Sequence, residues 1–188
     1  AAAVNADAVN RAAGLAAETP REETLEEIVE RRAEFLVGYQ DEKYSRAYRD
    51  IVEAIRARTE KIAGGEDFTK AVARYLFKLM AYKDEYEVAR LFTDGAFRQK
   101  LAREFTGDFK LKFHMAPPIF NSETDAEGRK KKKEFGPWMY AALSVLKRLK
   151  FVRGTAFDPF GRTAERRMER RLIAEYKARI ADIVDNMT

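Results

Sequence analysis

Apolar residues recur every three or four positions along much of the chain, a spacing that predicts amphipathic helices. The first covers residues 24–39, because Thr24 and Glu27 have the spacing of a capping box at its start. Further helices are expected over residues 44–62, 69–80, 86–92, 97–105, 138–149 and 163–187. In the last of these, the expected buried face consists of Met168, Leu172, Tyr176, Ile180, Ile183 and Met187.

The apolar period changes from helical spacing to strict alternation over residues 108–115. Phe109, Leu111, Phe113 and Met115 alternate with polar residues there, which predicts a half-buried strand. A single strand leaves its backbone groups unpaired. Residues 151–157 are the best local partner, and the alternative is that the strand joins a sheet in another part of a longer polypeptide. Residues 121–134 are polar and are expected to form an exposed loop, while residues 151–161 are expected to form an aromatic one.

These elements predict a mainly α fold: one domain of about six or seven helices around one core, with a short strand or hairpin. The chain has 188 residues, enough for a sizeable core. It has no Cys, which excludes disulfides, thiolate-held zinc and an iron–sulfur cluster ligated by this segment. No apolar run is long enough for a membrane helix or a signal peptide, so we expect a cytoplasmic protein. It begins with Ala, as expected of a segment of a longer polypeptide.

Three stretches carry a resemblance to a known family. They are residues 71–91 (AVARYLFKLMAYKDEYEVARL), residues 112–118 (KFHMAPP) followed by FGPW at 135–138, and residues 153–170 (RGTAFDPFGRTAERRMER). In this order and at these distances they resemble the C-terminal region of the fused, single-polypeptide indolepyruvate ferredoxin oxidoreductases. The resemblance assigns residues 24–188 to a helical C-terminal domain and residues 1–23 to a linker and the tail of a preceding gamma-type domain.

The resemblance implies a parent enzyme that oxidatively decarboxylates aryl or branched 2-oxo acids to acyl-CoA and reduces ferredoxin. The parent would use thiamine diphosphate, magnesium, an iron–sulfur cluster and coenzyme A, and would form a homo-oligomer. None of the family's catalytic residues falls on a position of this chain. The segment is therefore expected to be an accessory, non-catalytic domain that holds no cofactor or metal, contacts the remaining parent domains, and touches neither nucleic acid nor membrane.

One cluster of residues has the composition of an anion site: Arg153, Thr155, Asp158, Arg162 and Thr163. Gly154 and Gly161 permit tight turns, the arginines offer forked donors, and Thr163 opens a helix whose amides favour negative charge. The functional interpretation is a pocket for a phosphate or carboxylate, such as the tail of coenzyme A. The structural interpretation is that Asp158 and the arginines fix an aromatic loop to the helices.

A dense basic run offers a second candidate site. It consists of Arg129, Lys130, Lys131, Lys132 and Lys133. It could steer an acidic electron carrier such as ferredoxin, or it could be a solvated loop. A nucleic-acid patch is disfavoured, because the run has no interleaved aromatics and the whole chain is only mildly basic, at +5 with 36 basic and 31 acidic residues.

Two further groups of polar residues allow either a chemical or a structural role. Residues 83–90 contain Asp84, Glu85, Glu87 and Arg90, which could supply an acid and a base, or a helix cap and an ion pair. His114 is the sole histidine. It could act as a base, although hydrogen bonding to a loop is the simpler role, and alone it cannot form a metal site.

Two other classes of function compete with the accessory domain. One is a free-standing helical interaction module that binds an anionic partner through the basic run. The other is a small independent enzyme that uses Arg153, Asp158 and Arg162. Six aromatic residues are expected to belong to the core rather than to a stacking platform: Phe113, Phe135, Trp138, Phe151, Phe157 and Phe160.

Overall fold

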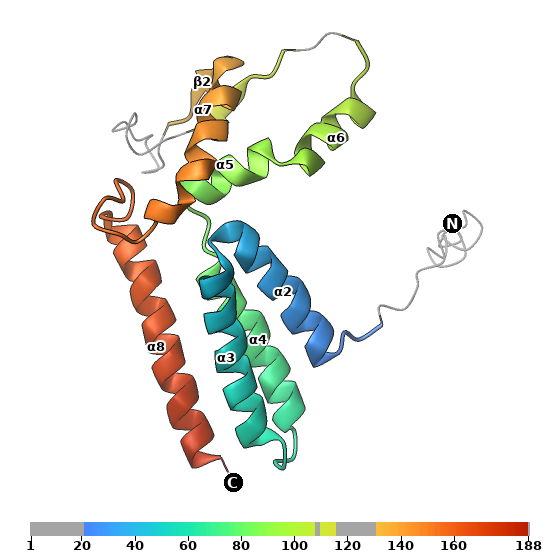
Figure 1. The fold of residues 1–188 in the computed structure, drawn as a ribbon, viewed down its shortest axis with the longest axis vertical. Coiled ribbons are helices and arrows are strands. Elements are labelled where there is room, and N and C mark those ends of the chain that lie inside the picture. The colour runs from blue at the N-terminus through green and yellow to red at the C-terminus, as the bar shows by residue number, and fades with distance from the viewer. Residues whose placement is uncertain (1–20, 108–109, 116–130, 188) are drawn as a thin grey trace, which may run out of the picture.

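The computed structural model describes residues 21–107, 110–115 and 131–187. Seven α-helices, one 3₁₀ helix and one two-stranded hairpin lie in this part of the chain (Figure 1), which confirms the predicted mainly α class. In order they are α2 (Leu25–Tyr39), α3 (Glu42–Thr59), α4 (Gly65–Met80), α5 (Glu85–Thr93), α6 (Gly95–Glu104), β1 (Phe113–Met115), β2 (Lys133–Phe135), α7 (Trp138–Leu146), η1 (Lys147–Val152) and α8 (Ala164–Asn186).

Helices α2, α3, α4 and α8 form a bundle, with α8 running alongside α3 and α4 (Figure 1). The predicted capping box starts α2: the Glu27 amide donates to Thr24 Oγ1 at 3.2 Å, and the Thr24 amide donates to Glu27 Oε2 at 2.9 Å. Thr163 caps α8 as predicted, by accepting from the Arg166 amide at 3.3 Å. The local signals for helix starts are therefore correct at both ends of the bundle.

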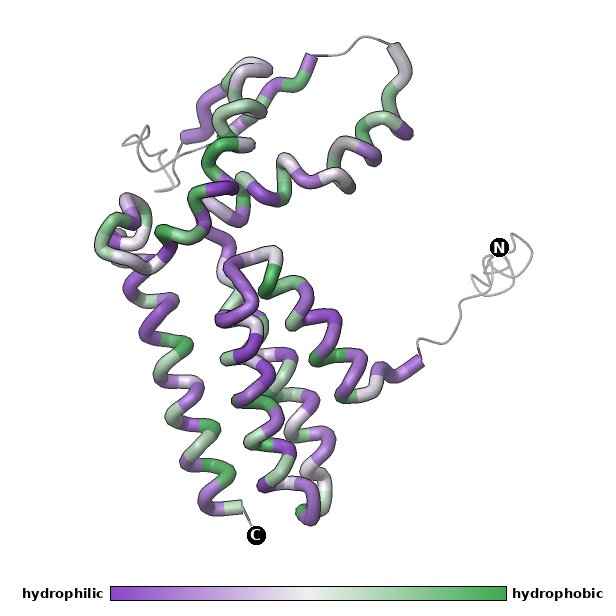
Figure 2. Tube along the Cα trace, viewed as in Figure 1, coloured by the Kyte–Doolittle hydropathy of each residue, from purple (hydrophilic) through white to green (hydrophobic). Residues whose placement is uncertain are grey.

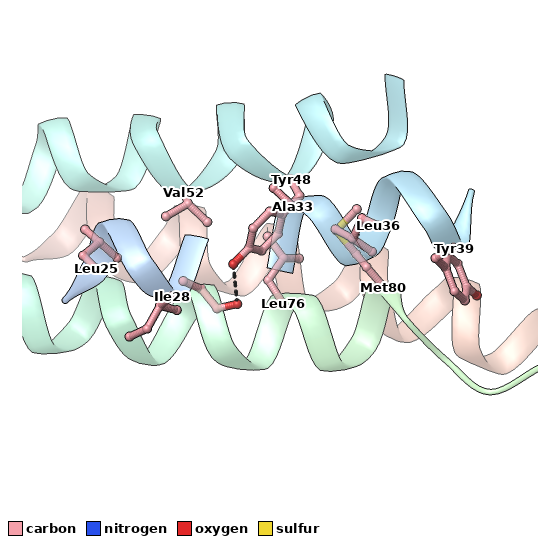
Figure 3. Packing of buried hydrophobic residues seen from close by; sticks show 10 residues of the cluster. Leu25, Ile28, Ala33, Leu36, Tyr39, Tyr48, Val52, Leu76 and Met80 are labelled. Atoms are coloured by element: carbon pink, nitrogen blue, oxygen red, sulfur yellow. Dashed lines mark hydrogen bonds between the residues drawn. The ribbon is translucent and has the colours of Figure 1, made fainter. Parts of the chain in front are cut away.

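The bundle core combines aliphatic residues with buried tyrosines whose hydroxyls are all satisfied (Figure 3). Tyr48 donates to the Ala73 carbonyl at 2.9 Å and Tyr39 donates to the Tyr82 carbonyl at 3.0 Å. Burial raises the pKa of Tyr48 to about 12. These bonds connect α3 to α4 and the end of α2 to the segment after α4. The tyrosines therefore fix how these elements are oriented relative to one another, in addition to burying apolar area.

The predicted buried face of α8 is wrong in part. Met168, Leu172 and Ile183 are 47%, 39% and 44% exposed. The residues that face the bundle are Ile173, Tyr176, Ile180, Val184 and Met187. Both sets keep helical spacing and share members, so periodicity alone could not choose between them. The groove between α3 and α4 selects the second set.

A second apolar cluster lies outside the bundle and joins α5, the hairpin and α7. Its buried members are Ala89, Phe113, Met139 and Leu143. The sequence predicted one core, whereas this cluster shares no residue with the bundle core. Figure 1 shows this smaller unit at the end of the bundle, connected to it through α5 and through the segment that leads into α8.

The predicted partner of the strand is wrong. β1 pairs antiparallel with β2, so that Phe113 is opposite Phe135 and His114 is opposite Glu134. A salt bridge of 2.8 Å between Lys112 Nζ and Glu134 Oε1 adds to this pairing. Residues 151–157 cannot pair with β1, because their first two residues belong to η1 and the rest form turns. The regular strand is also shorter than predicted; residues 108–109 lie outside the described part.

Candidate functional site

A buried arginine connects the bundle to the smaller unit. Arg153 follows η1, and its guanidinium binds Asp84, with Nε to Oδ2 at 2.5 Å and Nη2 to Oδ1 at 2.8 Å. Its Nη1 donates to the Tyr39 carbonyl at 2.5 Å and to Gln40 Oε1 at 2.8 Å. The guanidinium also lies 3.8 Å from the centre of the Tyr39 ring. One side chain therefore holds the end of α2, the start of α5 and the end of η1 together.

The charge of Arg153 is neutralised inside the protein. Its side chain is 6% exposed and that of Asp84 is 3% exposed. Burial opposes the guanidinium charge, but the hydrogen bond to Asp84 and the neighbouring Tyr39 outweigh it, so the pKa of Arg153 is raised above its usual value. Asp84 also caps α5, accepting from the Glu87 amide at 2.8 Å. The Asp84 carboxylate therefore accepts three hydrogen bonds inside the protein.

Asp158 organises the loop between η1 and α8. Its Oδ2 accepts from the Gly154 amide at 2.7 Å, and its Oδ1 accepts from the Phe160 amide and from the Tyr86 hydroxyl, both at 3.1 Å. Gly154 has φ of 75°, in the region that favours glycine. A Cβ on Gly161 would lie 2.5 Å from Asp158 Oδ2. Gly161 is therefore required by the close approach of this carboxylate, whereas Gly154 is favoured by its positive φ.

Arg166 adds another connection between α8 and the start of α5. It binds Glu169, three residues further along α8, at 2.6 Å, and it also reaches Glu85 at 3.4 Å. We use the name clamp for Asp84, Glu85, Tyr86, Arg153, Asp158 and Arg166. These residues come from two of the three stretches that carry the family resemblance, residues 71–91 and 153–170, and those stretches contact each other through the clamp.

The five anion-site candidates do not converge on one point. Arg153 and Asp158 belong to the clamp, and Thr163 caps α8. Thr155 Oγ1 donates to the Val152 carbonyl at 2.7 Å, and Arg162 donates to the Ala156 carbonyl at 2.7 Å. These contacts agree with the structural interpretation, in which Asp158 and the arginines fix the aromatic loop to the helices. Binding of an anion by these five residues stays a prediction.

The charged residues at 83–90 form a helix cap and an ion pair, as in the structural alternative given above. Arg90 binds Glu87 through two hydrogen bonds of 2.8 Å, and its guanidinium lies 4.6 Å from the centre of the Phe35 ring. Glu87 is only 3% exposed. The residues that the structure describes contain no group of three His, Asp or Glu side chains that could hold a metal ion.

The basic run lies at and before β2. Lys131, Lys132 and Lys133 are exposed, while Arg129 and Lys130 lie outside the described residues. His114, on β1, is exposed, and its Nε2 lies 3.7 Å from Glu134 Oε2. It therefore lies on the strand beside a carboxylate of the neighbouring strand, whereas the simpler role expected for it was a hydrogen bond to a loop. Glu134 also places a negative charge among the lysines, which lowers the charge density of this surface.

An apolar stripe on α7 and η1 faces solvent. Trp138, Val145 and Leu149 recur at helical spacing and are 60%, 61% and 40% exposed. Phe151, in η1, and Phe157, in the loop that follows it, are also exposed, at 66% and 85%. Figure 2 shows apolar residues along α7, which runs from the hairpin toward the bundle. Three of the six aromatics expected in the core are thus exposed, while Phe113 and Phe160 are buried.

Comparison with protein families assigns the chain. A model described as "Family of unknown function (DUF6537)" matches residues 25–188. The chain belongs to this family. No curated protein and no solved structure matches it. The family's match begins at Leu25, where α2 begins, and it includes the clamp, the hairpin and the exposed stripe.

The exposed stripe is the feature that the sequence analysis missed. The pattern over residues 138–149 predicted a helix correctly, but Trp138 at its start was expected to belong to the core. A usable signal was present: Met139 and Leu143 form a second apolar row on the same helix, and this row is the buried one. A helix that is apolar on two faces needs two partners. No helix in the described part of the chain is long and apolar enough to cross a membrane.

Proposed function

We propose that this chain is the accessory, non-catalytic C-terminal domain of an indolepyruvate ferredoxin oxidoreductase, and that it packs on the catalytic body of that enzyme. The observation that carries the proposal is the exposed stripe of Trp138, Val145 and Leu149, together with Phe151 and Phe157. Several large apolar side chains exposed within one unit are typical of a surface that contacts another protein. The family resemblance of residues 71–91, 112–138 and 153–170 supplies the identity of the partner.

The use of charges in the clamp supports a scaffold role. Asp84 and Arg153 neutralise each other, and Asp158 accepts three hydrogen bonds. A catalytic acid or base needs a proton-accepting position that substrate can reach. These carboxylates are at most 3% exposed and are committed to donors inside the protein. Their geometry stabilises a junction between helices.

The cofactors implied by the resemblance belong to other domains in this proposal. The chain has no Cys for a thiolate-held cluster, and the described residues do not supply a metal-ligating triad. The thiamine chemistry, the electron transfer and coenzyme A binding are therefore assigned to the rest of a homo-oligomeric cytoplasmic parent. This domain would hold neighbouring parts of that parent in position.

Docking of ferredoxin is the second role that we propose for the domain. Lys132 and Lys133 are exposed and adjacent, and an acidic carrier would be attracted to them. The alternative, a free-standing module that binds another anionic partner, uses the same lysines. The two differ in context, because only the first requires the oxidoreductase polypeptide.

Deletion from the full-length enzyme tests the accessory role. Removal of residues 24–188 should impair assembly or ferredoxin reduction, while the thiamine cofactor stays bound. The isolated chain should give no turnover with 2-oxo acid, thiamine diphosphate and coenzyme A. If assembly, coenzyme A affinity and ferredoxin reduction are all unchanged by the deletion, or if the isolated chain turns over, the proposal is wrong.

A surface variant separates docking from folding. Val145→Asp combined with Phe157→Asp should leave the helical content and melting temperature of the isolated chain nearly unchanged, because both side chains are more than half exposed. In the full-length enzyme the same pair should weaken assembly. Tyr75→Asp, at a residue 58% exposed on the bundle, is the matched control and should not weaken it.

A further inference from the structure

A cavity of about 330 Å³ lies between the bundle and the clamp. Its size is at the lower end of the range for small-molecule sites, roughly 300–1,000 Å³. The turn after α2, the start of α3, the end of α4 and one face of α8 surround it. The apolar part of its wall consists of Tyr44, Met80, Tyr82, Ile173 and Ala174. Two of these are tyrosines, so the wall offers aromatic as well as aliphatic contact.

Two cations lie on the α8 side of this cavity. Arg170 and Lys177 are seven residues apart, about two helical turns, and Ile173 and Ala174 lie between them on the same face. In the part of the chain that the structure describes, neither cation has a carboxylate within salt-bridge distance. Arg153 also lines the cavity, but Asp84 already neutralises it. The cavity therefore has an excess of positive charge.

Arg170 has an unused donor. Its Nη2 donates to the Gly161 carbonyl at 2.7 Å, while its Nη1 is shielded from solvent and has no hydrogen-bond acceptor among the described residues. Buried donors of this kind are rare and costly, and an unfilled one calls for a physical explanation such as backbone strain, a bound water or a bound ion. The Tyr82 hydroxyl, on the apolar wall of the same cavity, also interacts with Arg170.

We infer that this cavity binds a small organic anion with an apolar body, held by its carboxylate or phosphate group at Arg170 and Lys177. Arginine suits either group because its donors are forked, and lysine adds a point charge. The apolar body would lie against Tyr44, Tyr82 and Ala174. The site goes beyond the accessory role, because it needs only residues of this chain and requires no contact with a parent enzyme.

Titration of the 188-residue chain with chosen probes tests the chemistry of the site. The probes are 3-phenylpropionate and phenyl phosphate, with neutral 3-phenylpropanamide and inorganic phosphate for comparison. Loss of a charged hydrogen bond should make the amide bind about tenfold more weakly than the acid, or worse. Inorganic phosphate should also bind more weakly than phenyl phosphate. The ratio of the two organic anions distinguishes a carboxylate site from a phosphate site.

Variants of α8 test the location of the site. Lys177→Gln should weaken binding of the better anion about tenfold, whereas Arg179→Gln, which removes an exposed charge of the same helix outside the cavity, should not. Ala174→Phe should fill the cavity and abolish binding, with Ala178→Phe as its control. Circular dichroism establishes that each variant is folded.

Three outcomes overturn the inference: neither anion binds at about ten millimolar, the amide binds as tightly as the acid, or the cavity variants bind no more weakly than their controls. Equal losses in Lys177→Gln and Arg179→Gln would mean that only the overall charge of α8 attracts the anion.

Discussion

Replacement of Arg153 by methionine should uncouple the smaller unit from the bundle. The change leaves the Asp84 carboxylate, whose side chain is 3% exposed, without its guanidinium partner. Breaking a buried pair by removing one member costs about 3–5 kcal/mol of folding free energy. The lost contacts to the Tyr39 carbonyl and Gln40 belong to the same side chain and are included in that cost.

A double-mutant cycle separates the pair from the rest of the side chain. Asp84→Asn retains an oxygen that can cap α5 but removes the charge. Arg153→Met and Asp84→Asn together should cost less than the sum of the single changes, by about 0.5–3 kcal/mol. Arg171→Met is the control: its partner Glu175 lies at 3.3 Å with both side chains at least half exposed, and the loss should stay below about 0.5 kcal/mol.

The assay uses the single tryptophan of the chain. Trp138 starts α7 in the smaller unit, so its fluorescence reports that unit, whereas far-UV circular dichroism is dominated by the bundle helices. Urea unfolding followed by both probes should coincide in the wild type. In Arg153→Met the fluorescence transition should move to lower urea. Coincident transitions in that variant, with a cost below about 1 kcal/mol, would refute the coupling argument.

Further predictions concern buried groups. Burial raises the pKa of Tyr48 from 10.0 to about 12, so its contribution to stability is complete below about pH 10 and is lost as pH rises toward 12, by up to about 1.4 kcal/mol per unit. Urea unfolding between about pH 9 and pH 12 should show this fall, with a smaller slope in Tyr48→Phe; a flat profile would contradict it. Gly161→Ala should lower the melting temperature, because the new Cβ would lie 2.5 Å from Asp158, whereas Gly95→Ala meets nothing within 4 Å and should not.

Signals within a few residues could be predicted from the sequence. The capping box at Thr24, the caps at Asp84 and Thr163 and the Arg166–Glu169 pair all depend on contacts within one helical turn. The helices themselves are predicted by apolar residues at every third or fourth position and by the glycines and prolines that end each run. These features need no knowledge of the remaining chain, which is why a single sequence contains them.

Features that depend on distant partners could not be predicted. The choice of Ile173 and Val184 over Leu172 and Ile183 for the inner face of α8 depends on where α3 and α4 leave a groove. The pairing of β1 with β2 depends on the Phe113–Phe135 contact across a segment that read as loop. The Asp84–Arg153 bond joins residues 69 positions apart. Asp84 and Arg153 were each candidate site residues in the sequence, but in two separate clusters. Nothing in their local pattern indicates that they form an ion pair.

Hydrogen–deuterium exchange tests the accessory role most directly. The backbone amides of residues 138–157 would be followed in the isolated chain and in the full-length oxidoreductase under the same conditions. The account predicts slower exchange of α7, η1 and the following loop in the full-length enzyme, with the outer face of α4 unchanged. Equal exchange of residues 138–157 in both forms would contradict it.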